Sequence, residues 1–106
     1  MEIAFNTQSL RSICEKEDLM DKKLGSAGAK ALQVCLADLR AASTVADLTA
    51  NYSAEVVSRS DIVLVPADGL RLRLRTTDSK VKNLKADGSD WTKVSRLKIM
   101  EIIGRV

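Results

Sequence analysis

The stretch from Leu70 to Arg75 alternates leucine with arginine at every position. Side chains of a β-strand point alternately to its two faces, whereas a helix would distribute the same residues around its circumference. The pattern therefore predicts a strand with one apolar face and one cationic face. Asp68 and Gly69, just before it, are typical of a hairpin turn, so the β-branched run from Asp61 to Val65 is its expected partner.

Other short segments also favour strands. Glu2 to Phe5 predicts an edge strand at the start of the chain, and Glu55 to Arg59 and Lys80 to Leu84 predict short strands in the C-terminal half. Val94 to Ile103 predicts a longer final strand because it is rich in β-branched residues, with a helix as the alternative.

The N-terminal half has helical periodicity. A first helix, capped by Asn6 or Thr7, is expected to run as far as Gly25, a typical helix terminator. A second helix is expected over Ser26 to Ala42, followed by a short helical turn from Ser43 to Leu48. The apolar face of the second helix repeats at i, i+3, i+4 and i+7 and consists of Ala29, Leu32, Cys35, Leu36 and Leu39.

These elements predict the α+β class: two N-terminal helices packed on one face of a small, mostly antiparallel sheet. The length of 106 residues fits one domain covering residues 1–106. Only 3% of the residues are aromatic, so the core must be aliphatic, and base-stacking platforms are not expected.

The composition excludes several kinds of chemistry. Histidine is absent, which excludes histidine-based triads and imidazole acid–base catalysis. The two cysteines, Cys14 and Cys35, fall on apolar stripes and are expected to be buried; they are too few for a metal site. We expect no metal and no cofactor. No apolar run approaches the length of a membrane span, so we expect a cytoplasmic protein with no membrane partner.

Basic residues dominate from Arg59 onward, and their spacing favours an anionic partner such as nucleic acid. Neighbouring arginines on one face of the Leu70–Arg75 strand stand about 6.6–7 Å apart, close to the spacing of successive phosphates. If the final strand lies beside it, five cations share one face: Arg71, Arg73, Arg75, Arg96 and Lys98. Lys93, Lys80 and Lys82 would line the rim of that face.

The alternative is an ordinary solvent-exposed sheet face, on which arginine is a normal residue. In that case Glu55, Asp61 or Glu101 would neutralise the arginines across the strands.

Three segments, Asn6–Cys14, Leu36–Ala42 and Asp90–Ile99, together resemble the HigB-like branch of the RelE/ParE toxin superfamily. Members are the toxin halves of bacterial type II toxin–antitoxin modules, also called plasmid maintenance killer proteins. The resemblance implies a fold of two N-terminal helices on a curved antiparallel sheet. It also implies a cognate antitoxin of the helix-turn-helix type as partner, with the toxin either a monomer or in a hetero-oligomer with that antitoxin.

RelE-type members of this superfamily cleave mRNA on the ribosome, which implies a metal-independent endoribonuclease. The segment Asp68–Arg71 resembles the family's turn-Gly-Tyr-Arg segment, so Arg71 matches the arginine that stabilises the phosphate in the transition state. The resemblance and the charge pattern together make Arg71, Arg73 and Lys98 the catalytic candidates. The RNA-binding candidates are Arg75, Arg96, Lys93, Lys80 and Lys82.

The chain departs from the family pattern at two places. Leu70 replaces the usual aromatic residue, and the segment from Ile103 to Val106 has no counterpart of the family's C-terminal tyrosine or histidine. Acid–base catalysis would then fall to lysine or arginine, and a lysine needs a pKa depressed by neighbouring cations. The alternative is a non-catalytic binding module, either gyrase-directed like ParE or a silent homologue held by its antitoxin.

Overall fold

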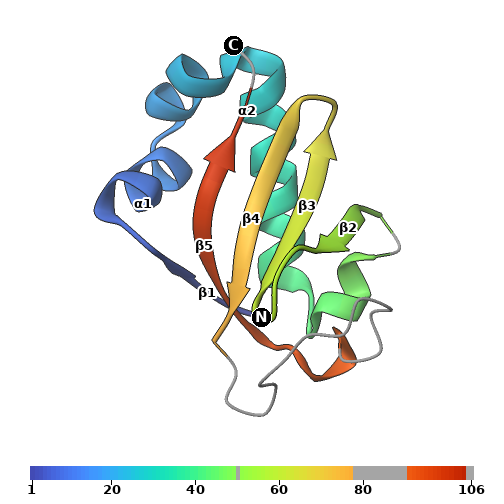
Figure 1. Ribbon diagram of the computed structural model, residues 1–106. Helices are drawn as coiled ribbons and strands as arrows, with labels where there is room; N and C mark the ends of the chain where they lie inside the picture. Colours follow the sequence, from blue (N-terminus) through green and yellow to red (C-terminus); the bar gives the residue numbers. More distant parts are fainter. Residues whose placement is uncertain (50, 78–90, 105–106) are drawn as a thin grey trace.

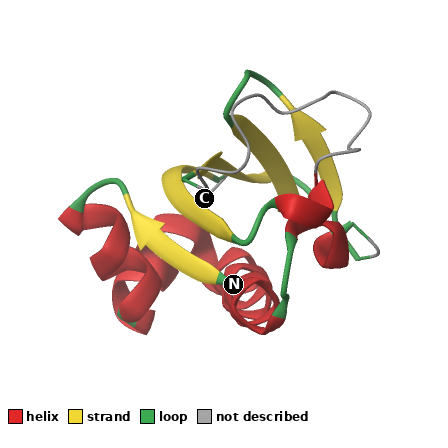
Figure 2. Ribbon diagram, turned by 90° about the horizontal axis from the view of Figure 1, so that it is seen from below, coloured by secondary structure: helices red, strands yellow, loops and turns green. Residues whose placement is uncertain are grey.

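The computed structural model describes residues 1–49, 51–77 and 91–104. Its elements are, in chain order, β1 (Glu2–Phe5), α1 (Gln8–Glu15), α2 (Glu17–Ala41), the 3-10 turn η1 (Val45–Leu48), β2 (Ser53–Val56), β3 (Asp61–Ala67), β4 (Leu70–Thr76), the 3-10 turn η2 (Trp91–Lys93) and β5 (Arg96–Ile103). The helices cover one face of the sheet, as both views show (Figures 1 and 2). The predicted α+β layout is therefore confirmed. The expected strand Lys80–Leu84 lies outside the described residues.

The sheet has the strand order β1-β5-β4-β3-β2. β1 pairs with β5 in parallel, and the other pairs are antiparallel, so β1 is an edge strand as expected. The segment Glu55–Arg59 was expected as a strand, but β2 ends at Val56. The chain turns there into β3, because the Val57 N–H donates to the Asp61 carbonyl at 3.0 Å. The final segment is a strand, as favoured, although it begins at Arg96 instead of Val94.

The helices divide differently from the prediction. The first helix ends at Glu15, well before Gly25, because Lys16 has an extended backbone (φ −114°, ψ 113°). α2 then begins at Glu17, where Glu17 and Asp18 place negative charge in its first turn, the favourable end of the helix dipole. Gly25 interrupts α2 with φ 75° and ψ 168°, a conformation that glycine adopts readily. The predicted break at Gly25 is therefore real, but it is a kink within α2.

The leucines of β4 form the centre of the core. Leu70, Leu72 and Leu74 are all buried, and they belong to one core together with the buried side chains of α2. Each fully buried leucine contributes about 1.5–3 kcal/mol relative to an exposed one. Cys14 and Cys35 are both buried free thiols, as expected. No helix among the described residues is long and apolar enough to cross a membrane.

Two register shifts keep the apolar side chains on the helix side. β3 has one extra residue relative to β4 between Leu64 and Ala67, and β5 has one extra residue opposite the Arg73–Leu74 step. The first bulge contains Pro66, which lacks an N–H and is tolerated at such positions. Because of this bulge, Asp61 lies directly opposite Arg75.

Candidate nucleic-acid interface on the open face of the sheet

We call the side of the sheet turned away from the helices the open face. It faces the viewer in Figure 1, with α2 behind it. Its centre is β4, whose arginines alternate with the buried leucines, and β5 lies beside β4 as the prediction required. The five expected cations therefore share this face: Arg71, Arg73, Arg75, Arg96 and Lys98.

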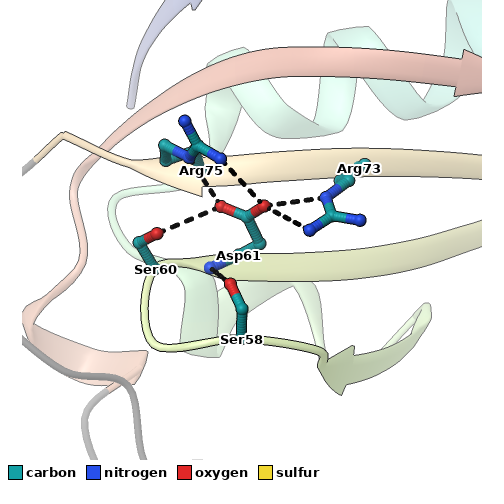
Figure 3. A network of polar contacts seen from close by, with 5 residues as sticks. All are labelled: Ser58, Ser60, Asp61, Arg73 and Arg75. Atoms are coloured by element: carbon teal, nitrogen blue, oxygen red, sulfur yellow. Dashed lines mark hydrogen bonds and ion pairs between the residues drawn. The ribbon is translucent and has the colours of Figure 1, made fainter.

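Two of the three arginines share one carboxylate, that of Asp61 (Figure 3). Arg75 binds it with two nitrogens: Nε donates to Oδ1 at 2.8 Å and Nη2 to Oδ2 at 3.3 Å. Arg73 approaches from the other side, with Nε and Nη2 both 2.7 Å from Oδ2. Of the three acidic residues expected as counter-ions, Glu55, Asp61 and Glu101, Asp61 is the one that pairs with these arginines among the described residues.

Two serines complete the surroundings of Asp61. The Ser60 hydroxyl donates to Oδ1 at 3.2 Å, and the Asp61 N–H donates to Ser58 Oγ at 3.2 Å. Sequence reasoning missed both serines. A signal was present, because serine shortly before an aspartate at a strand start is typical of a side-chain-stabilised turn.

The Asp61 carboxylate is shielded from water by its own partners. It is 0% exposed, although the side chains of Arg73 and Arg75 are 39% and 45% exposed, so the cluster lies at the surface of the sheet. Hydrogen bonding from Arg75, reinforced by Arg73, lowers the pKa of Asp61 against the opposing effect of desolvation. The same contact raises the pKa of Arg75. The cluster thus holds two guanidinium charges against one carboxylate charge.

Arg71 and Lys98 differ from this pair. Neither side chain makes a hydrogen bond or ion pair with another residue in the described part of the chain. Arg71 is exposed and lies opposite Ile103, which is 47% exposed. Lys98, on β5, lies opposite Arg75 of β4. These two side chains are the cations of the open face that remain available to a ligand.

The remaining candidates contribute less. Arg96 pairs with Glu2 of β1, Nε to Oε2 at 3.2 Å, with both side chains exposed. Lys93 is exposed but lies in η2, outside the sheet. The positions of Lys80 and Lys82 lie outside the described residues.

The open face also carries further acidic groups. Glu101 of β5 lies opposite Arg73, and Glu55 of β2 lies opposite Val63, which is the neighbour of Arg73 on β3. Neither glutamate forms an ion pair with another described residue. With Asp61 and Glu2, they set four carboxylates against the five cations that the described residues place on this face. The expected strongly basic face is thus a mixed face, whose excess positive charge lies on β4 and β5.

Two hollows among the described residues are lined by none of these cations. One of about 210 Å³ lies at the β3–β4 turn, between Leu24 and Gly69, and the other borders β1 and the start of α1. Cations spread along two neighbouring strands suit an extended chain better than a small molecule.

Nothing in the described ranges suggests a metal centre, since no group of three or more metal-ligating side chains comes together there. Comparison with known proteins gives no relative for this chain: no family model, curated protein or solved structure matches it.

Proposed function

We propose that this chain is the toxin of a bacterial type II toxin–antitoxin module, and that it acts in the cytoplasm on ribosome-bound mRNA through the open face. The observation that carries the proposal is the arginine row of β4 on the open face, with Lys98 of β5 beside it. Guanidinium groups bind phosphate with two parallel hydrogen bonds and keep their charge at any physiological pH.

The layout supports the same proposal. Two N-terminal helices pack on one side of a mostly antiparallel sheet, which is the arrangement that the resemblance to RelE-type toxins implies. The helices leave the opposite side of the sheet uncovered (Figure 2). That side carries Arg71, Arg73 and Lys98, the residues that the resemblance and the charge pattern make catalytic candidates.

The structure suggests separate roles for the candidate residues. Arg71 has no counter-ion among the described residues, so it is the arginine best able to stabilise charge on a scissile phosphate. Lys98 is the candidate for proton transfer, since it is the uncommitted amine of the same face. Arg73 and Arg75, tied to Asp61, would shape the site around them.

Expression of the chain in bacteria without an antitoxin tests the proposal. We expect growth arrest, together with new mRNA 5′ ends mapped by primer extension. Arg71→Gln combined with Lys98→Gln should abolish both effects. Lys22→Gln combined with Lys30→Gln, two exposed lysines of α2, removes the same charge away from the open face and should leave both effects intact. A harmless wild-type chain would refute the toxin proposal.

A non-catalytic binding module is the second candidate, and the near balance of charge on the open face favours it. Glu55 and Glu101 would weaken the attraction of a polyanion, whereas a mixed face can match a protein partner. This alternative predicts growth arrest without mRNA cleavage, through a target such as gyrase, or stable binding to an antitoxin alone. Primer extension on arrested cells separates the two candidates.

A further inference from the structure

The point on the open face where two arginines converge is already occupied by a carboxylate of the protein itself. Arg75 presents Nε and Nη2 to Asp61 as a two-pronged donor, which is the geometry by which arginine binds phosphate. Arg73 adds two more donor contacts to Oδ2. The Asp61 carboxylate therefore stands where a single phosphate would otherwise bind between these arginines.

A ligand meets only the remaining donors. In Figure 3 the terminal nitrogens of Arg73 and Arg75 that do not contact Asp61 point away from it, in different directions. The uncommitted cations lie on either side of the cluster: Arg71 is four residues from Arg75 along β4, and Lys98 lies beside Arg75. At about 3.3 Å per residue, Arg71 and Lys98 are roughly 13 Å apart along the strand direction.

We propose that Asp61 is a built-in competitor for the anion site of the open face, so that the face selects a single-stranded phosphodiester chain over a single phosphate. The proposal rests on the proposed function for the location of the ligand. A tethered carboxylate acts at a high effective concentration, so a free phosphate must displace it without compensation. A polynucleotide reaches Arg71 and Lys98 together, because two of its phosphates that are two linkages apart span roughly that distance.

Two matched substitutions on β4 test the proposal by their effect on binding of a 12-nucleotide single-stranded RNA. Arg71→Gln should weaken binding about tenfold. It should also reduce the slope of log K against log salt concentration by about 0.7, the value for one lost phosphate contact on a single strand. Arg75→Gln removes the same charge from the same face, but the side chain that it removes is already bound to Asp61. It should weaken binding less than threefold and leave the salt dependence unchanged. Equal losses for the two variants would overturn the proposal.

Removal of the competitor gives the second test. Asp61→Asn should let inorganic phosphate displace the RNA at concentrations where chloride of the same ionic strength does not. The wild-type chain should show no difference between the two salts. Glu101→Gln is the control, because it removes a carboxylate from the same face that has no partner among the described residues. The proposal fails if Glu101→Gln behaves like Asp61→Asn. It also fails if phosphate displaces RNA from the wild-type chain at concentrations where chloride of the same ionic strength does not.

The two proposals can fail separately. The toxin proposal is refuted, and the proposal about Asp61 stands, if the wild-type chain causes no growth arrest but binds RNA, and Arg71→Gln weakens that binding more than Arg75→Gln does. A toxic chain without that contrast refutes the competitor alone. Should Asp61→Asn fail to fold, as judged by circular dichroism, the Arg71 and Arg75 pair decides the question, since Asp61 keeps Arg73 as a partner when Arg75 is replaced. A wild-type chain that binds no RNA even at low salt refutes the competitor as stated.

Discussion

Replacement of Leu72 by alanine tests the division of β4 into a core face and an open face. Leu72 is 0% exposed and pairs with Leu64 on one side and Ile102 on the other, both of them buried. Neighbours on both strands leave little freedom to close the space, so the loss should be at least about 3 kcal/mol, within the range of roughly 2–5 kcal/mol for buried leucines. That is a large part of the roughly 5–15 kcal/mol that stabilises a typical domain.

Urea denaturation at pH 7, followed by Trp91 fluorescence and far-UV circular dichroism, measures this loss. For a chain of this size, about 3 kcal/mol corresponds to a decrease in Tm of roughly 12–24 °C. Arg71→Ala is the matched control, because Arg71 is the preceding residue of the same strand and is exposed. Its effect should stay within about 0.5 kcal/mol. A cost below about 1 kcal/mol for Leu72→Ala, or equal costs for the two variants, would show that the two faces have been assigned wrongly.

Three further predictions follow from named groups. Arg75 and Arg73 lower the pKa of Asp61, so this carboxylate adds stability above its unfolded pKa of about 3.9, and that stability is lost as the pH falls through the folded pKa. Asp61→Asn should therefore make the free energy of unfolding fall less steeply between pH 7 and pH 2, as measured by urea denaturation. An unchanged pH dependence would contradict the ion cluster. Gly25→Ala should lower stability by about 1–3 kcal/mol because of the positive φ, although its Cβ would meet no atom within 4 Å, and an unchanged Tm would argue against the kink. Burial raises the pKa of Cys14 to about 11 and of Cys35 to about 12, so both thiols should resist iodoacetamide at pH 8 until the chain unfolds. Rapid labelling of the folded chain, detected by mass spectrometry, would show that the thiols are accessible.

The sheet could be anticipated from local patterns. The leucine–arginine alternation fixes the two faces of β4, and Asp68–Gly69 places its partner strand, with Gly69 at φ 79° in the turn. The parallel pairing of β1 with β5 could not be read in this way, since it joins the two ends of the chain and depends on the whole layout. The break at Lys16 was also missed, because a charged residue between helical segments carries no strong stop signal.

The bulge in β3 was predictable in principle but was not predicted. A two-residue turn without a bulge would set Ile62 opposite Arg75, which would bury an arginine or expose an isoleucine. One extra residue in β3 removes the conflict by pairing Ile62 with Leu74, and Pro66 marks its place. The spacing of Leu97, Ile99 and Ile102 carries the same information for β5, since all three are buried although the last interval is three residues.

The charge of the site was harder to foresee than its location, and the reason lies in the same bulge. Strand alternation places Arg71, Arg73 and Arg75 on one face without naming their neighbours. The register decides those neighbours: with the bulge, Asp61 faces Arg75 and reaches Arg73, whereas Arg71, beside the bulge, has no acidic partner among the described residues. Three arginines that look equivalent in the sequence therefore differ in their availability to a ligand. On the proposed function, a ligand of this face would first meet Arg71 and Lys98, and the chemistry of Arg73 and Arg75 cannot be separated from that of Asp61.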